Sequence, residues 1–266
     1  MNSQQQAQRL HPPSLDELKQ LFIAKYGDPD STGPGPAQRY RFNYYNPDEY
    51  YEALLDRLVT PGCSWLDVGC GRDIFPSNPS LAQRLADRAG QLVGIDPDET
   101  LQENPFVHEK VQGLLDDYRP DSKFDLITLR MVAEHVENPA RLIEALNFCA
   151  HSGSIVVIYT VFKYSPIPLL TNLVPFTMRH PIKKWLWSTE EKDTFPTCFL
   201  MNTRRTLDQL FNNGGFTEEL FLRLDDCRTS NKFAALQRIE LVLWSLFNTL
   251  KLHYPEHCIL GVYRKI

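Results

Sequence analysis

Short apolar runs alternate with amphipathic segments through the middle of the chain. The apolar runs cover 64–70, 91–96, 107–111, 124–129 and 154–162, and the segments of helical spacing cover 80–89, 99–103 and 139–150. Strands that alternate with helices indicate βαβ units and a mostly parallel sheet. The near-continuous apolar run 126–129 is typical of a strand in a sheet that is covered on both faces.

Further elements precede and follow this alternation. Ser14 and Glu17 form a capping-box pattern that opens a short helix, and Pro47 is typical of the first position of a second helix. The glycines and prolines of 27–38 predict a loop between them. After Thr203 the pattern predicts a helix that stops at Gly214, a strand over 216–224, a long helix over 232–250 and a last strand over 257–263.

Taken together, these elements predict an α/β fold with a mostly parallel, seven-stranded, doubly wound sheet and helices on both faces. We expect an N-terminal arm and helical segment over 1–60 and the principal domain over 61–266. A segment over about 163–202 follows the fifth strand without a clean period, and insertions of this length are often lids or binding loops. We expect it to form a cap over the substrate, with side chains from Tyr164, Phe176, His180, Lys183, Lys184, Trp185, Trp187 and Phe195.

The predicted helix over 232–250 is apolar on nearly all sides toward its end. A helix of this kind is usually buried, so we expect burial in the core or in a homodimer. Together with Pro168, Leu169 and Leu170 it would make an apolar surface, which suits a lipid-like substrate, a membrane interface or a second subunit.

Composition narrows the function classes. The 266 residues are 42% hydrophobic and 23% charged, as in ordinary globular proteins, and the net charge is −5. An acidic balance gives no electrostatic footprint for a nucleic acid, so we expect a small-molecule substrate. No apolar run approaches the ~20 residues of a membrane span. The N-terminus lacks the apolar core of a signal peptide, and six scattered cysteines without a Cys-x-x-Cys pair indicate reduced thiols in a cytoplasmic protein and no metal site.

The most specific chemical signal is the run Asp67-Val68-Gly69-Cys70-Gly71. Glycines at the carboxyl end of a strand let the backbone approach a ligand closely. Asp96 ends the next apolar strand, followed by Pro97, and a carboxylate there can accept hydrogen bonds from both ribose hydroxyls of an adenosine. A dinucleotide is disfavoured, because the third glycine of its fingerprint is missing and Asp67 would lie near a pyrophosphate.

This pattern resembles the class I (Rossmann-like) S-adenosylmethionine-dependent methyltransferases, in their small-molecule branch. Asp67–Gly71 matches their first-strand motif and Asp96 their second-strand acid. Residues 124–129 look like their fourth strand, and 132–139 (VAEHVENP) resemble the run that follows it. The matches cover about residues 60–162 in the right order, and the closing strand also looks similar. The resemblance implies S-adenosylmethionine as cofactor and S-adenosylhomocysteine as product.

The resemblance also implies roles for single residues. Asp67 would order the glycine turn and help to position the cofactor's ammonium group, and Asp96 would hold the ribose. The expected cofactor-binding residues are Asp67, Gly69, Cys70, Gly71, Asp96, Pro97, Leu115, Asp116 and Arg130, where Leu115 and Asp116 would reach the adenine and Arg130 would lie beside the methionine moiety. Asp73 stands where the family has a glycine. It either caps the following turn or needs a basic partner, for which Arg72 and Arg41 are candidates.

His135 is the candidate catalytic base, because it follows the fourth strand and histidine titrates near neutral pH. The alternative is that the Glu-His-Val run only shapes the turn. We expect a methyltransferase that acts on a small-molecule hydroxyl. The alternatives are a non-catalytic S-adenosylmethionine-binding protein, for which Asp73 is the support, and a protein or nucleic-acid methyltransferase.

Overall fold

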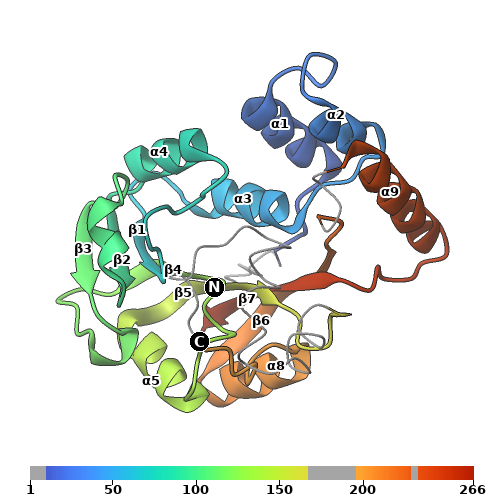
Figure 1. Ribbon diagram of the computed structural model, residues 1–266. Helices are drawn as coiled ribbons and strands as arrows, with labels where there is room; N and C mark the ends of the chain where they lie inside the picture. Colours follow the sequence, from blue (N-terminus) through green and yellow to red (C-terminus); the bar gives the residue numbers. More distant parts are fainter. Residues whose placement is uncertain (1–9, 167–195, 229–232) are drawn as a thin grey trace, which may run out of the picture.

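A single sheet organises the computed structural model, which describes residues 10–166, 196–228 and 233–266. Its seven strands lie in the order β3-β2-β1-β4-β5-β7-β6 (Figure 1). They are β1 (Ser64–Val68), β2 (Gln91–Asp96), β3 (Glu109–Gln112), β4 (Phe124–Arg130), β5 (Ala150–Val161), β6 (Phe216–Asp225) and β7 (His257–Lys265). The first five strands pair in parallel, and β7 runs antiparallel between β5 and β6. The expected α/β fold is confirmed.

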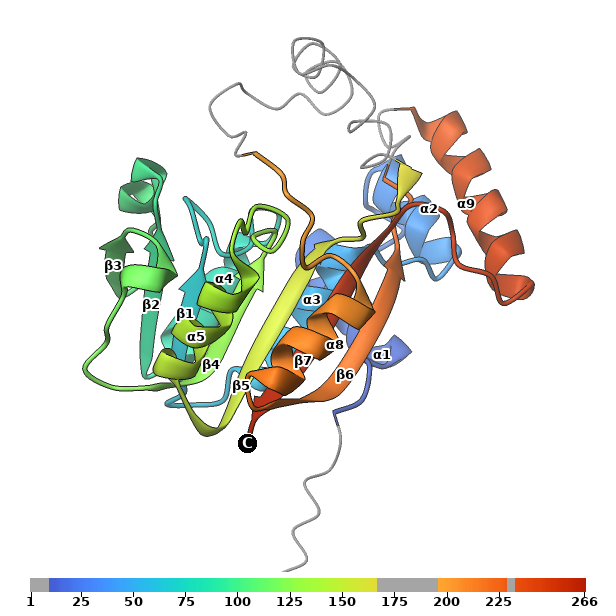
Figure 2. The same ribbon diagram turned by 90° about the horizontal axis from the view of Figure 1, so that it is seen from below.

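Helices cover both faces of the sheet. The helices α3 (Pro47–Leu58) and α4 (Pro79–Arg88) pack on one face, and α5 (Pro139–Cys149) and α8 (Arg204–Asn213) pack on the other (Figures 1 and 2). An apolar core lies on each side, one containing Trp65 and the other Ile127 and Phe211. Because side chains alternate between the two faces of a strand, two cores require strands that are apolar throughout.

The N-terminal part holds α1 (Leu15–Tyr26) and α2 (Pro34–Arg41) besides α3. Capping boxes open α1, at Ser14 and Glu17, and α3, at Asn46 and Glu49. The expectation of a loop over 27–38 is wrong at its end, because α2 begins at Pro34. Proline is tolerated in the first helical turn, whose N–H groups have no partner within the helix, and Gly33 serves as the N-cap.

Two strands begin at residues other than those expected. β3 begins at Glu109 rather than at residue 107, while Val107 packs into the core just before the strand. β5 begins at Ala150, where the Ser154 hydroxyl accepts from His151 N (2.8 Å) and donates to Phe124 O (2.7 Å). These bonds connect β4 and β5 where the register of their pairing shifts, between Phe124 and Leu126. Short 3₁₀ helices follow β2 and β3, η1 (Glu99–Glu103) and η2 (Leu115–Asp117).

Of the two alternatives expected for the long C-terminal helix, burial in the core is wrong, and burial in a homodimer stays a prediction. In α9 (Ala234–Thr249) only Gln237, Glu240 and Leu241 are buried, whereas most of its large apolar side chains are exposed. The helix packs beside α2 at the outer edge of the molecule (Figure 2). The face of α9 that turns inward carries the polar residues Gln237 and Glu240, so its apolar residues do not place it in the core.

Two further expectations concern the remaining segments. The proposed cap falls largely on residues 167–195, which lie outside the described residues, so that of its candidate side chains only the exposed Tyr164 is described. Within the described ranges, no helix has the length and apolar character needed to traverse a lipid bilayer.

Candidate cofactor-binding and active site

The candidate residues gather where β1, β2 and β4 end. β1 lies between β2 and β4, so the chain winds outward in both directions from this point of the sheet. In open α/β sheets ligands bind outside the carboxyl ends of the strands at such a switch point. The turn after β1, the last residue of β2 and the loop after β4 are therefore neighbours.

The turn after β1 presents bare backbone. Gly69 has φ +71° and Gly71 has φ +47°, values that other residues seldom adopt. A Cβ atom on Gly69 would lie 2.2 Å from Cγ2 of Val132, so a side chain there would also collide with the loop after β4. Cys70 between them is buried, with its sulfur against Gly94. It therefore contributes main chain, not its thiol, to the edge.

Asp96 ties this turn to the end of β2. Its Oδ2 accepts from Gly71 N (2.8 Å) and its Oδ1 accepts from Asp98 N (2.8 Å). Asn104 holds the turn from the other side, because its side-chain amide donates to Gly71 O (3.0 Å). Burial raises the pKa of the Asp96 carboxyl in spite of the two N–H donors. Each oxygen still has a second lone pair, so the carboxylate can accept further hydrogen bonds.

Asp67 lies deeper, near the end of β1. Its side chain is buried, and the Thr128 hydroxyl donates to Oδ1 over 2.5 Å. The indole of Trp65 in turn donates to Thr128 Oγ1 (2.7 Å). Burial raises the pKa of Asp67 to about 7, against the lowering effects of the Thr128 bond and the positive charge of Arg130. A cation at this point would favour the ionised carboxylate.

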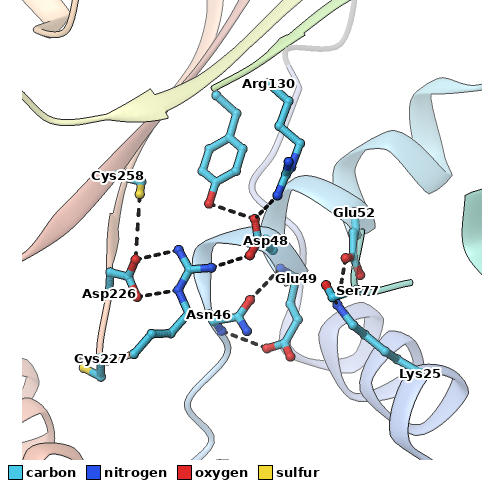
Figure 3. A network of polar contacts seen from close by, with 12 residues as sticks. Lys25, Asn46, Asp48, Glu49, Glu52, Ser77, Arg130, Asp226, Cys227 and Cys258 are labelled. Atoms are coloured by element: carbon cyan, nitrogen blue, oxygen red, sulfur yellow. Dashed lines mark hydrogen bonds and ion pairs between the residues drawn. The ribbon is translucent and has the colours of Figure 1, made fainter. Parts of the chain in front are cut away.

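A cluster of paired charges lies beyond β4 (Figure 3). Arg130, the last residue of β4, donates to Oδ1 of Asp48 on α3 (3.2 Å), and the Tyr159 hydroxyl donates to the same oxygen (3.1 Å). Burial opposes ionisation of Asp48, but Arg228 and Arg130 outweigh it and hold the pKa of Asp48 below its usual value. The Arg130 side chain is therefore directed to α3. At the carboxyl end of β4 only the main chain of Arg130 is left to contact a ligand.

The second half of this cluster comes from the segment after β6. Arg228 contacts the other oxygen of Asp48 and binds both oxygens of Asp226 (2.7 and 2.6 Å). Two arginines thus balance two aspartates. No motif or spacing in the sequence marks Asp48, Asp226 or Arg228. Asp48 has the sequence pattern of an acid in the first turn of a helix, which gives no signal for a buried partner.

The loop after β4 is fixed by Glu134. Its buried carboxylate accepts from the Thr160 hydroxyl (2.7 Å), and burial raises its pKa. Its main-chain oxygen accepts from Cys198 N (2.7 Å) and Phe199 N (3.2 Å), while Asn202 donates to Thr160 Oγ1 (2.8 Å). The end of the insertion is thereby attached to the edge of the sheet.

His135 follows Glu134 and takes part in the same attachment. Its Nδ1 lies 2.9 Å from the main-chain oxygen of Pro196. Because a carbonyl oxygen only accepts, Nδ1 carries the proton of this bond, and in the neutral ring Nε2 is then the basic nitrogen. The bond to Pro196 therefore favours the tautomer with its proton on Nδ1, in which Nε2 can accept a proton.

The remaining candidates lie around this edge. Leu115 is buried in the core on η2, and Asp116 beside it pairs with Arg141 (3.3 Å), whereas Pro97 is exposed. Arg72, a candidate partner for a cofactor carboxylate, instead pairs with Glu103 (2.7 Å). Asp73 is half-buried and Arg41 is exposed.

Met131 is a residue that the sequence did not reveal. It has φ +53° directly after β4, and its N–H donates to Tyr159 O (2.8 Å). Methionine has no preference for this left-handed conformation, which costs on the order of 1 kcal/mol. Backbone strain of this kind often occurs at functional sites.

Comparison with known proteins agrees with this geometry. The sequence model of a family described as "Methyltransferase domain" matches residues 37–219, well over half of the chain. The chain belongs to this methyltransferase family. The match includes the glycine turn, Asp96, Arg130 and His135.

Curated relatives of this methyltransferase are similar over part of their length. The ubiquinone biosynthesis O-methyltransferase of Hahella chejuensis is 31% identical over 116 residues, which are 40% of this chain and 46% of that protein. The protein of the same name from Coxiella burnetii is 26% identical over 142 residues, 50% of this chain and 58% of that one. The chain spans about half the length of the curated relatives it matches.

Solved structures share the fold. The cyclopropane synthase MmaA2 from Mycobacterium tuberculosis superposes with a TM-score of 0.52 at 13% identity, covering 96% of this chain and 99% of that chain. A putative S-adenosylmethionine-dependent methyltransferase from Listeria monocytogenes gives 0.52 at 13% identity, with 83% and 97% covered. At this identity the likeness concerns the architecture of the methyltransferase.

Proposed function

We propose that the protein transfers a methyl group from S-adenosylmethionine to a hydroxyl of a small molecule. The observation that carries this proposal is the glycine turn after β1, whose Gly71 N–H is held by the Asp96 carboxylate at a distance of 2.8 Å. The curated relatives that match the central strands are named as O-methyltransferases, which favours an oxygen acceptor.

The residues at the edge fit the proposed cofactor. Gly69 and Gly71 leave no side chain between the backbone and a ligand, and the free lone pairs of Asp96 suit two ribose hydroxyls. Asp67 suits an ammonium group, because a buried carboxyl with a pKa of about 7 gains most from a neighbouring cation. The other residues assigned to the cofactor are Cys70, Pro97, Leu115, Asp116 and the main chain of Arg130. When bound, S-adenosylmethionine supplies a methyl group already activated by its sulfonium.

Alignment and proton removal are left to the protein. Orientation of a nucleophile against the methyl group can contribute ~7–11 kcal/mol. A hydroxyl also has to lose its proton, and His135 is assigned this role, with Nδ1–H held by Pro196 O and Nε2 as the accepting atom. Glu134 positions His135 by fixing the loop through Thr160.

The proposal extends to organisation and location. Residues 61–266 form the catalytic domain, residues 1–60 its N-terminal segment, and the insertion over about 163–202 its substrate cap. A cytoplasmic location agrees with six cysteines of which none forms a disulfide and five are buried.

Binding and turnover test the proposal directly. Titration of the protein with S-adenosylmethionine and S-adenosylhomocysteine should show heat of association and a raised melting temperature. Incubation with a panel of phenolic and aliphatic hydroxyl compounds should yield a product one methyl group heavier. The absence of binding would refute the assignment. Binding without turnover on hydroxyl, amine, protein or nucleic-acid acceptors would identify a non-catalytic protein.

The role of His135 has its own test. Replacement of His135 by Ala should lower kcat by about 10²-fold or more, because the acceptor hydroxyl then has no base to take its proton. His151→Ala is the matched control, because His151 pairs with Asp125 at the amino ends of the strands. A decrease below about threefold for His135→Ala would exclude a base role.

A further inference from the structure

Exposed apolar side chains are concentrated on α9 and immediately beside its two ends. Eight of the 15 large apolar side chains that are exposed among the described residues lie between positions 233 and 252. They are Phe233, Leu236, Ile239, Val242, Leu243, Leu246, Leu250 and Leu252, each with 46% to 65% of its surface exposed. A concentration of this kind indicates an interaction site.

The spacing of these side chains indicates a partner helix. Leu236, Ile239, Leu243, Leu246 and Leu250 follow one another at intervals of three, four, three and four residues. This is the 3.5-residue repeat of a coiled-coil seam, in which apolar side chains of one helix insert between those of another. We call these five positions the α9 seam.

The helix is held with this seam facing outward. On its inner side Tyr254 donates to Glu240 (3.2 Å), the indole of Trp244 donates to Asp225 (3.2 Å), and Leu241 packs against Tyr44. Rolling the helix to bury the seam would break these contacts and expose Leu241. Among the residues that the structure describes, the seam therefore has no cover.

Charge argues against a membrane or a strongly charged partner. Between Ile239 and Leu250 the only charged residue is Glu240, which is buried. Helices that bind membrane surfaces carry many lysines and arginines beside their apolar face, whereas here only Lys232, Arg238 and Lys251 lie within four residues of the seam in sequence. An uncharged leucine seam is complementary to another of the same composition.

We propose that α9 pairs with α9 of a second copy of this chain, forming a two-fold symmetric dimer. Eight half-exposed side chains amount to several hundred Å² of apolar surface per chain, on the order of the ~800 Å² per partner of a standard interface. The same surface patch serves both subunits, as two-fold symmetry requires. A seam of about two heptads is short for a coiled coil, so dissociation in the micromolar range is expected.

Sedimentation velocity of the full-length protein tests the proposal. From about 1 to about 100 μM the mass should rise from that of one chain, 30.7 kDa, toward twice that value. A mass of one chain throughout this range would overturn the proposal.

Matched variants locate the interface. The double variant Leu243→Glu and Leu246→Glu should be monomeric at about 100 μM, while binding S-adenosylmethionine within about threefold of the natural chain. The control is Leu15→Glu with Ile23→Glu, which places the same charges on exposed apolar positions of α1 and should leave the dimer intact. A dimer that persists in the α9 variant, or is lost equally in the control, would contradict the assignment.

A cysteine at the centre of the seam gives a second measurement. Leu243 lies at the middle of the five positions, so in a two-fold pair it meets its own copy whether the helices run parallel or antiparallel. In a Cys198→Ser background, Leu243→Cys should form a covalent dimer under a mild added oxidant, and Phe148→Cys on α5 should not. A dimer in solution that fails to cross-link through position 243 would place the interface elsewhere.

Discussion

The two halves of the sheet's carboxyl edge are built differently. At β1 and β2 the partners are close in sequence, and Asp96 reaches back 25 residues to the glycine turn. Beyond β4, Asp48 is bound to Arg130 and to Arg228, 82 and 180 residues away. The first half keeps carboxylate lone pairs and bare backbone for a ligand, whereas in the second half paired charges bind one another.

This difference separates binding from stability. In the first half a carboxylate can be lost without leaving a buried charge, so the effect should appear in cofactor affinity. In the second half the loss of one charge leaves a partner unneutralised, and the cost should appear in folding. Variants in the first half should therefore lower cofactor affinity without lowering stability, and variants in the second half should lower stability.

The largest effect is expected at Asp48. Asp48→Asn keeps the shape but leaves Arg130 without its carboxylate, and should lower the free energy of unfolding by about 3 kcal/mol. This is the lower end of the range for buried pairs, because the side chains of Arg130 and Arg228 are 26% and 32% exposed. Urea unfolding measures it. Cofactor affinity at low temperature should change by less than about threefold.

A more exposed group of charges supplies the control for Asp48, because the side chain of Asp56 is 31% exposed against 11% for Asp48. Asp56 binds Arg84 and Arg88 on the outside of α4, and Asp56→Asn should cost less than about 1 kcal/mol. Equal losses in the two variants would show that the cluster beyond β4 behaves as an ordinary surface ion pair.

The next effect concerns Asp67 and depends on pH. Its pKa is about 7 in the folded chain against 3.8 in the unfolded chain, so ionisation disfavours the fold as pH rises between these values. The natural chain should therefore lose about 2–3 kcal/mol of stability relative to Asp67→Asn between pH 5 and pH 8. Thermal unfolding of both chains across this range checks the sign, and parallel pH curves would contradict it.

The same residue should link cofactor binding to proton release. An ammonium group beside Asp67 lowers its pKa, so binding near pH 6.5 should release part of a proton. Calorimetry in two buffers of different ionisation enthalpy measures this release, which Asp67→Asn should abolish.

A smaller effect on free energy is expected at Asp96. Asp96→Ala should weaken S-adenosylmethionine binding by at least about tenfold, since a hydrogen bond to a charged acceptor contributes ~1.5–3 kcal/mol. Asn104→Ala is the control, because it loosens the same turn through Gly71 O and leaves the carboxylate in place. If both variants weaken binding equally, Asp96 only shapes the turn.

The smallest effect is expected at Arg72. Its guanidinium pairs with Glu103, and both side chains are about 60% exposed. Arg72→Ala should therefore change cofactor affinity by less than about twofold. A tenfold loss of affinity in calorimetric titration would instead identify Arg72 as the residue that binds the cofactor's carboxylate. It would then be the basic partner that Asp73 needs at this position.

Local chemistry was predictable from the sequence, whereas long-range pairing was not. The glycine turn and Asp96 could be predicted because strand, turn and acid follow one another in the chain. The cluster at Asp48 could not, because its four charges come from three distant segments, and each by itself resembles a solvated surface residue. The strained backbone of Met131 also has no signature in residue type.

The two helices that were misjudged show a related limit. α2 was missed because Gly and Pro count as breakers, although their position in the first turn makes them compatible with a helix. For α9 the apolar residues by themselves predict burial in the core or in a homodimer, and the core alternative fails because Gln237 and Glu240 face inward. The residues that decide which face of α9 turns inward, among them Tyr254 and Asp225, lie outside the helix itself.

Two hydrogen bonds connect Trp65 through Thr128 to Asp67, so the fluorescence of Trp65 can report on the ligand site of the methyltransferase. The indole is wholly shielded from solvent and hydrogen-bonds to the hydroxyl that also binds the carboxyl expected to meet the ligand. A change of charge on that carboxyl will alter the electric field at the ring and hence its ultraviolet emission. Occupancy of the site can then be followed by fluorescence without any attached dye.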